Sequence, residues 1–413
     1  MADEAIRRLE RMKQSRSRNR PCSHERERVD QAPPAHARGF ELSKTAPKLS
    51  RRKAGEFFVY PFAHAMSARH SAEQLLAFAT ALLARAGLDD EKARVVAEVL
   101  LEADLLGHTT HGLALLAPYL GEIEKGSMAK TGEPCVLADL PAAVTWDGRR
   151  LPGPWLTVRA LELAAARAKT NGSCTVVIRR SHHIACLAAY LKRVTDQGLM
   201  VVLSCSDPCV ASVAPFGGRV GIMTPNPLAA AWPTQGDPVM IDVSMSITTN
   251  ALTNRLAGER KKFPGRWALD ARGEPTDDSA VLSANPPGTL LPIGGVDHGH
   301  KGYALALLVE ALTCGLAGHG RADPKEGWGA SVFLQVFAPA HFGGEKDFRR
   351  QTEHLAAACR ANPPRPGVER VRLPGEAGLR RRADQLAQGV ALHTSILPAL
   401  APWARKLGVP TPH

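Results

Sequence analysis

The sequence contains no long apolar run. Nowhere do roughly 18 apolar residues follow one another without interruption, so no membrane-spanning helix is predicted. The first residues also lack the apolar stretch of a secretory signal. Aromatic residues make up only 5% of the chain, so its core must be built mainly from Ala, Leu and Val. We therefore expect a protein without membrane segments.

Paired cysteine motifs are also missing. The eight cysteines are spread along the chain, and none forms a Cys-x-x-Cys pair. In a chain of this length such spacing is typical of free thiols in a reducing compartment, which predicts a cytoplasmic protein. Cys205 and Cys209 lie four positions apart, but no second pair lies nearby to complete a zinc site. No metal site is predicted.

Positive charge is concentrated near the N-terminus. The formal net charge is +12, and residues 1–55 hold 15 Lys or Arg against 7 Asp or Glu. This segment has few large apolar residues and cannot bury enough surface to offset the entropy lost on ordering. We expect residues 1–65 to be a basic, disordered extension, with Met66 as an alternative start of the chain. Non-specific binding of polyanions by this tail is an alternative role; specific recognition of nucleic acid is not predicted.

Beyond Met66 the hydrophobic pattern alternates between helical and strand periods. Apolar residues recur at three and four positions after Ser71 and after Asp89, and Gly87 and Gly107 end these two helices. Further helices are predicted over 156–169, 185–195, 301–316, 348–360 and from 397, and strands over 144–146, 175–178, 199–203, 239–243 and 331–337. A chain of 413 residues exceeds the size of one core. The sequence therefore predicts an α/β protein with two lobes.

Glycine-rich nucleotide motifs are absent. No Gly-x-Gly-x-x-Gly follows a predicted strand, so a standard Rossmann lobe has no support, and Gly299-His300-Lys301-Gly302 does not match the Walker A spacing. The turn could still hold a phosphate through Lys301 at a helix N-terminus, or be a plain turn. Gly375 and Glu376, followed by arginines at 380–382, form either a second anion patch or a solvated basic surface.

Several residues stand where acid–base or ligand chemistry could occur. His108 and His111 lie three positions apart near a helix end, a spacing that puts both on one helical face. His183 follows a predicted strand, and strand ends in open α/β sheets collect ligand groups. Imidazole can transfer a proton near neutral pH, and Thr110 could orient His111. Asp242 ends another strand and could accept from a ribose hydroxyl or cap a turn. The residues alone leave structural roles open for all of them.

Taken in order, a set of short motifs resembles the malate/L-lactate dehydrogenase family, whose members include ureidoglycolate and sulfolactate dehydrogenases and piperideine-2-carboxylate reductase. The resemblance runs from about residue 70 to residue 410. The motifs are Gly107-His108-Thr109-Thr110-His111-Gly112, Pro118-Tyr119-Leu120, Ser181-His182-His183, Ala214-Pro215-Phe216-Gly217-Gly218, Thr224-Pro225-Asn226-Pro227, Asp242, Pro292-Ile293-Gly294-Gly295, His300-Lys301-Gly302-Tyr303 and Pro374-Gly375-Glu376. The resemblance implies an α/β, non-Rossmann fold with a helical lobe and a mixed-sheet cofactor-binding lobe. It assigns residues 66–145 to the helical N-terminal part, 146–299 to the cofactor-binding lobe and 300–413 to a C-terminal part that packs back on the N-terminal lobe.

The resemblance also implies an activity and a site. The activity is hydride exchange between NAD or NADP and a small-molecule substrate, a 2-oxo acid or a cyclic imine, in a homodimer. Thr110 and His111 are implied in proton transfer, His183 as a proton acceptor, and Tyr119 at the substrate. The cofactor contacts implied by the resemblance are Ala185, Asp207, Asp242, Val243, Ser244, His300, Lys301, Gly375 and Glu376.

Two positions depart from the family pattern. Leu115 stands where the family commonly has an Arg for the substrate carboxylate, and Leu252 stands where some members have an acid that completes the proton relay. Leucine cannot form the bidentate contact that Arg makes with a carboxylate. The departures suggest a different substrate, a different anion clamp such as Arg149 or Arg150, or lost activity. The alternative function is therefore a catalytically weakened paralogue that acts as a nucleotide-binding or regulatory protein.

Overall fold

The computed structural model describes residues 66–412, so the predictions about residues 1–65 lie outside the described residues. The helices of this part are α2 (Ala72–Arg85), α3 (Asp90–Leu106), η1 (Leu113–Leu115), α4 (Leu116–Glu124), α5 (Gly153–Asn171), α6 (Ala188–Thr195), α7 (Asn250–Gly258), η2 (Ser279–Ser283), α8 (Gly295–Glu310), η3 (Ala311–Gly315), η4 (Pro339–His341), α9 (Glu345–Ala361), α10 (Glu376–Gln388) and α11 (Ile396–Leu407). The strands are β1 (Met66–His70), β2 (Cys135–Leu140), β3 (Ala143–Asp147), β4 (Ser173–Ser181), β5 (Met200–Ser206), β6 (Leu228–Trp232), β7 (Val239–Val243), β8 (Ala268–Leu269), β9 (Pro275–Thr276), β10 (Thr289–Leu290), β11 (Ala330–Phe337) and β12 (Val390–His393). The predicted α/β class is confirmed.

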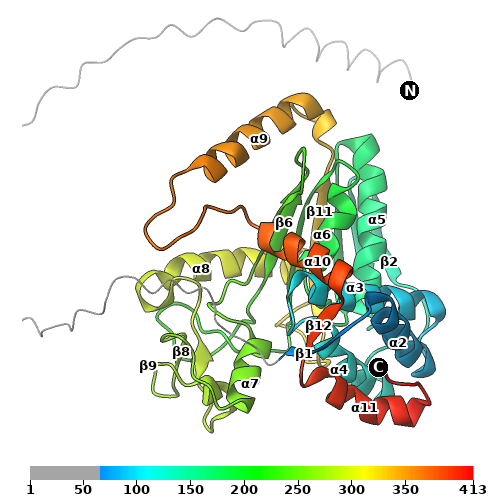
Figure 1. Ribbon diagram of the computed structural model, residues 1–413, viewed down its shortest axis with the longest axis vertical. Helices are drawn as coiled ribbons and strands as arrows, with labels where there is room; N and C mark the ends of the chain where they lie inside the picture. The colour runs from blue at the N-terminus through cyan, green and yellow to red at the C-terminus, as the bar shows by residue number, and fades with distance from the viewer. Residues whose placement is uncertain (1–65, 413) are drawn as a thin grey trace, which may run out of the picture. The chain divides into compact units, whose positions relative to one another are not determined.

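Within residues 66–412 a seven-stranded mixed sheet organises the fold (Figure 1). Its strand order is β2-β3-β4-β11-β5-β6-β7, and neighbouring strands are antiparallel except for the parallel pair β3 and β4. β11, although late in the sequence, lies in the middle and pairs over most of its length with both β4 and β5. Most of its residues are buried, as expected for a central strand with a continuous apolar sequence.

Helix α3 ends where the sequence predicts, and its end sets the position of the loop that follows. The Asp89 carboxylate caps its first turn by accepting from the Lys92 backbone N–H at 2.9 Å. Gly107 ends it with a φ of 93°, a left-handed conformation that glycine adopts without strain. The residues that follow are therefore outside the helix. The expectation that His108 and His111 share a helical face is wrong, because both lie in this loop, where the His111 N–H donates to the His108 carbonyl at 2.8 Å.

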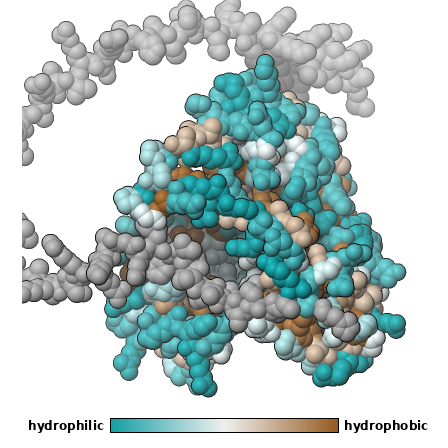
Figure 2. Space-filling model, in the orientation of Figure 1, coloured by the Kyte–Doolittle hydropathy of each residue, from teal (hydrophilic) through white to brown (hydrophobic). Residues whose placement is uncertain are grey.

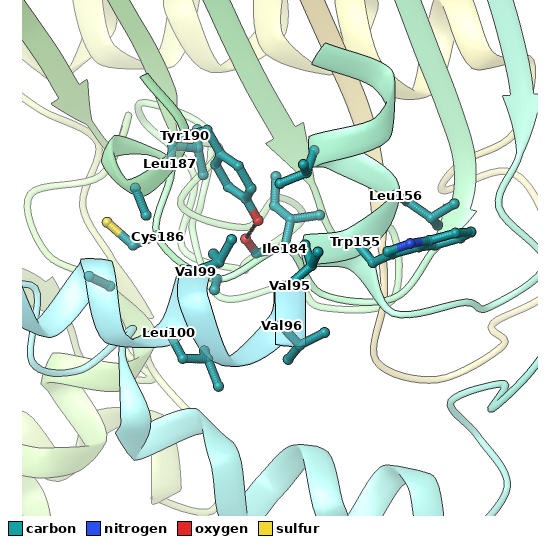
Figure 3. Close-up of a cluster of buried hydrophobic side chains, with 14 of the residues drawn as sticks. Val95, Val96, Val99, Leu100, Trp155, Leu156, Ile184, Cys186, Leu187 and Tyr190 are labelled. Atoms are coloured by element: carbon teal, nitrogen blue, oxygen red, sulfur yellow. Dashed lines mark hydrogen bonds between the residues drawn. The ribbon is translucent and has the colours of Figure 1, made fainter. Parts of the chain in front are cut away.

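Apolar burial joins the helices to the sheet. The larger hydrophobic core contains side chains of α2 to α6 and of the sheet. In Figure 3, Val95 and Val99 of α3 lie close to Ile184 and to Tyr190 of α6. The C-terminal segment contributes as well, since α11 packs on α2 and α4, and β12 pairs with β1. A smaller core lies in the segment that carries α7 and α8, and it consists of Val213, Met223, Met245, Leu256, Phe263, Ala268, Val281, Leu290, Ala306 and Val309.

Some elements were not predicted from the sequence. Helix α8 begins at Gly295, so the predicted turn at 299–302 is part of the helix rather than its start. Helices α7 and α10 and strands β2 and β12 lie in segments without a predicted element. Their sequences carry a weak hydrophobic signal: α10 buries only Leu379 and Gln385, and most of β2 is exposed.

The surface of the described part is mostly polar on the side that Figure 2 shows, with apolar residues in separate patches. None of the helices in residues 66–412 combines the length and the apolar character needed to cross a membrane.

A polar network connects the end of β5 to helix α8. Arg321 forms an ion pair with Glu310 at 2.8 Å and also donates to Ser206 Oγ and to the Val210 carbonyl, at 3.0 and 2.7 Å. The Asn226 amide donates to the same Glu310 carboxylate at 2.9 Å. These bonds hold the pKa of Glu310 below its ordinary value although burial acts in the opposite direction. The network therefore fixes the segment after β5 relative to α8.

Substitution Arg321→Ala should destabilise the fold by about 3 kcal/mol, because it leaves the half-buried Glu310 carboxylate without its cation. The matched control is Arg350→Ala, which removes an exposed pair with Asp347 and should cost less than about 0.5 kcal/mol. Urea unfolding followed by circular dichroism measures both values. Equal effects of the two substitutions would contradict a role for the network.

Candidate active site

A cleft of about 1210 Å³ lies where several chain segments end. Its walls come from the loop after α3, the ends of β4, β5 and β7, the start of α7 and the segment before β11. The predicted site residues that line it are His111, His183, Ala185, Asp207, Asp242 and Ser244. The fold thus brings together residues that are up to 133 positions apart in the sequence.

Tyr119 and His183 form a hydrogen-bonded pair beside the cleft. The Tyr119 hydroxyl lies 2.9 Å from His183 Nδ1 and 3.0 Å from the His183 carbonyl oxygen. The Ala185 N–H donates to the same Nδ1 at 3.3 Å, so the Nδ1 edge of the ring is held by Tyr119 and by the backbone. Burial raises the pKa of the Tyr119 hydroxyl well above its ordinary value and lowers that of His183 well below it. Both groups are therefore uncharged at neutral pH.

His111 is the second histidine of the cleft. Its ring lies 6.2 Å from that of His183, centroid to centroid, and its Nδ1 lies 2.8 Å from Thr110 Oγ1. Burial lowers the pKa of His111 to about 4, the nearby His108 acts in the same direction, and Asp242 partly opposes them. The Thr110 hydroxyl orients the ring, as the sequence suggested.

Trp328 is a site residue that the sequence did not reveal. Its ring lies 4.7 Å from the His183 ring and 5.5 Å from the Tyr119 ring. Arg150 holds the Trp328 backbone by donating to its carbonyl at 2.8 Å, and it also donates to Ser127. Neither Arg150 nor Arg149 is among the residues that line the cleft, so the hypothesis that one of them clamps a substrate anion is not supported.

The loop that carries His108 and His111 is held from two sides. The buried Asp104 carboxylate accepts from the Leu113 N–H at 2.6 Å, and Arg255 of α7 donates to Thr109 Oγ1 and to the Thr109 carbonyl, at 2.8 and 2.7 Å. Gly112 has no room for a side chain, because a Cβ there would lie 2.3 Å from Asp104 Oδ2. Burial raises the pKa of Asp104 to about 7, against the effects of the Leu113 N–H and Arg255. Asp104 and Arg255 were not predicted, since their roles arise from tertiary contacts.

Asp242 ends β7, as predicted, and its Oδ2 accepts from the Ala188 N–H at 2.8 Å. It therefore satisfies a donor in the first turn of α6 from another strand, a capping role that comes from tertiary structure rather than from a local turn. The Cys186 thiol lies 3.6 Å from the same oxygen. Asp207 binds the Cys209 N–H at 2.8 Å, and burial raises the pKa of the Asp207 carboxyl.

Three further polar groups line the cleft without a partner. They are Ser212 Oγ, Thr248 Oγ1 and Asn250 Oδ1, which are buried and form no hydrogen bond with another described residue. Buried polar groups normally have partners, so these atoms indicate a polar ligand. Thr248 and Asn250 stand at the start of α7, which is an additional source of backbone donors.

The remaining predicted residues lie elsewhere in the described chain. Val243 is exposed, and its side chain is not part of the cleft lining. His300 and Lys301 are exposed in α8, where the His300 ring contacts Phe216. Gly375 contacts β7 at Met240, and Glu376 pairs with an arginine at 2.6 Å. The arginines at 381 and 382 bind the α3 segment, to the Leu106 carbonyl and to Glu102, rather than the cleft. Leu115 and Leu252 do line the cleft.

Comparison with known proteins agrees with this geometry. The profile of the malate/L-lactate dehydrogenase family matches residues 70–401. The L-lactate dehydrogenase of Cupriavidus necator is 32% identical over 350 residues, which are 83% of this chain and 98% of that protein. The structure of malate dehydrogenase from Pyrococcus horikoshii has a TM-score of 0.75 at 26% identity. The match covers 83% of this chain and 96% of that protein chain. The structure of delta1-piperideine-2-carboxylate reductase from Pseudomonas syringae has a TM-score of 0.72 at 27% identity, with coverages of 82% and 100%.

The fold and the cleft are those of a dehydrogenase. The chain belongs to the malate/L-lactate dehydrogenase family. It is an oxidoreductase that acts on the CH–OH group of hydroxy acids, and this activity implies a nicotinamide cofactor.

Substitution Tyr119→Phe should lower kcat by about tenfold or more, because His183 loses the hydroxyl that orients its ring. It should also cost about 1 kcal/mol of stability. The matched control is Tyr190→Phe, which removes a buried hydroxyl that donates to the Ile184 carbonyl. The control should lose similar stability and keep its kcat. Steady-state kinetics and thermal unfolding of both variants measure these effects, and an equal loss of kcat in the two variants would contradict the assignment.

Proposed function

We propose that this dehydrogenase oxidises a small malate- or lactate-type 2-hydroxy acid to the 2-oxo acid and catalyses the reverse reduction, with NAD or NADP as the cofactor. In the reductive direction, a cyclic imine that carries a carboxylate is a related proposed substrate. The observation that carries the proposal is the pair of uncharged histidines in one cleft, with Tyr119 bonded to one of them. When bound, the nicotinamide supplies or accepts the hydride.

The proposed task of the histidines is proton transfer. In the oxidation direction His183 accepts the proton of the substrate hydroxyl, and Tyr119 holds its ring in place. His111, oriented by Thr110, stabilises the oxygen of the substrate from a second direction. Both rings are neutral because burial lowers their pKa, which suits the acceptance of a proton.

Polar groups of the cleft fit a dinucleotide. Asp207, Asp242 and Ser244 are proposed to bind it together with the backbone at Ala185, which has a φ of 59°. The buried, unpartnered atoms of Ser212, Thr248 and Asn250 supply further hydrogen-bonding positions. Five further cofactor contacts rest on the resemblance alone, and a rearrangement or a second subunit would be required to bring them to the cofactor. They are Val243, His300, Lys301, Gly375 and Glu376.

Exposed apolar residues support the proposed homodimer. Leu305, Leu307 and Leu308 of α8 are each nearly half exposed, and Leu355 of α9 is 65% exposed. Exposed large apolar side chains of this kind are often found at protein interfaces. The seven described cysteines are free thiols, which supports the proposed cytoplasmic location. We also propose that residues 146–299 carry the cofactor, between a helical N-terminal part and the C-terminal segment that packs on it.

A reductase screen tests the activity. Purified full-length protein should consume NADH or NADPH, followed by absorbance, with at least one member of a panel of 2-oxo acids and cyclic imine acids. His183→Asn and His111→Asn should each lower kcat by about 10² to 10⁴-fold, since the first removes the proton acceptor and the second removes the group that stabilises the substrate oxygen. Fluorescence titration should show that both variants still bind the cofactor. Cofactor binding by the unmodified protein without turnover on any substrate would contradict an active enzyme and fit a nucleotide-binding paralogue.

The pH dependence tests the role of the neutral histidines. A base must be unprotonated, so oxidation is lost as the pH falls through the folded pKa, which is about 4 for His111 and well below the ordinary value for His183. The kcat/KM for oxidation should therefore stay nearly constant between about pH 8 and pH 6. Reduction requires the protonated ring and should become faster as the pH falls. A decrease in oxidation centred near pH 6.5, the value of an ordinary histidine, would contradict this assignment.

A further inference from the structure

Three metal-ligating side chains converge at one wall of the cleft. They are His108 from the loop after α3, Cys186 from the segment after β4, and Asp242 at the end of β7. One potential ligand atom of each lies within 4.8 Å of those of the other two. His111 and His183 line the same cleft, but they are not members of this group.

The distance between the Cys186 and Asp242 ligand atoms is close to that of a tetrahedral zinc site. Zinc binds thiolate sulfur at about 2.3 Å and carboxylate oxygen or imidazole nitrogen at about 2.0 Å, so tetrahedral ligands lie about 3.5 Å apart. Cys186 Sγ and Asp242 Oδ2 are already 3.6 Å apart. A rotation of the His108 side chain, which borders the open cleft, would complete the set.

The surroundings of Asp242 are those of a metal ligand. Carboxylates that bind zinc are normally held by a further hydrogen bond, and the Ala188 N–H supplies one to Asp242 Oδ2 at 2.8 Å. Cys186 is buried, with 4% of its surface exposed, and its thiol faces a carboxylate rather than a cation. A divalent cation between the two groups would favour the thiolate.

We propose that His108, Cys186 and Asp242 form a binding site for Zn²⁺, with its fourth coordination position open to the cleft. On binding, the Cys186 S–H bond breaks, the Zn–S bond forms, and the proton is released to solvent. The carboxylate and the imidazole each donate an electron pair without a change of oxidation state. Three protein ligands and one open position are typical of zinc sites that bind a small molecule. This proposal shares Asp242 with the proposed cofactor contacts, but it does not depend on the proposed substrate or on the roles of His111 and His183.

Cobalt substitution tests the site directly. Titration of the full-length, metal-free protein with Co²⁺ should produce a near-ultraviolet thiolate-to-cobalt band that saturates at one equivalent, and Zn²⁺ should abolish it. Cys186→Ser should abolish the band, and His108→Gln should weaken Co²⁺ binding by about tenfold or more. The matched control is Cys205→Ser, which changes another buried, cleft-lining cysteine outside the group and should keep the band.

The pH dependence of Zn²⁺ binding is a second readout. Because one thiol proton is released, Zn²⁺ affinity should fall about tenfold when the pH is lowered by one unit near neutrality, and Cys186→Ser should lose that dependence. Circular dichroism identifies any variant that fails to fold, and His108→Gln then decides the test, because its side chain borders the cleft rather than the core. Absence of a saturable band, or a band that survives both Cys186→Ser and His108→Gln, would overturn the proposal. Enzyme activity is not measured, so failure here is distinguishable from failure of the proposed function.

Discussion

The site depends on how the loop between α3 and η1 is anchored. Asp104, which belongs to α3, accepts from the backbone beyond the loop, and Arg255 of α7 donates to Thr109 within it. One anchor comes from the larger core and the other from a helix of the smaller core. Gly112 allows the loop to approach Asp104 closely. The positions of His108, Thr110 and His111 therefore depend on the packing of both cores against each other.

Burial determines the chemistry of this loop and of the strand end that faces it. Removal of His111 and His183 from water lowers the pKa of each ring, so both are neutral bases rather than cations. The same burial keeps the Tyr119 hydroxyl protonated, so it can donate to the His183 carbonyl while it contacts Nδ1. The aromatic ring of Trp328 excludes water on one side of His183. The burial of these side chains thus determines both how they pack and which protonation state each one has.

The sequence predicts those features that depend on local pattern. The alternation of helices and strands, the ends of α3 and the apolar central strand β11 follow from periodicity and capping residues. His111 and His183 were found because ordered motifs surround them. Trp328 and Arg255 were missed, and Arg150 was given the wrong role, since each acts through a carbonyl or ring that only the fold brings near. Helix α10 was missed because its few buried residues give almost no periodic signal.

The departures from the family pattern change how the cleft can recognise an acid. Leu115 is only 8% exposed, and with Leu252 and Trp328 it gives the cleft apolar surface where an arginine is common in the family. These side chains cannot hold a carboxylate. An acid is then left to other groups of the lining, which include the Arg219 guanidinium as well as neutral hydrogen-bonding groups. A site of this kind selects by hydrogen bonding, because a molecule that lacks the matching group leaves buried polar atoms unpaired, and that cost distinguishes substrates more sharply than an apolar wall does.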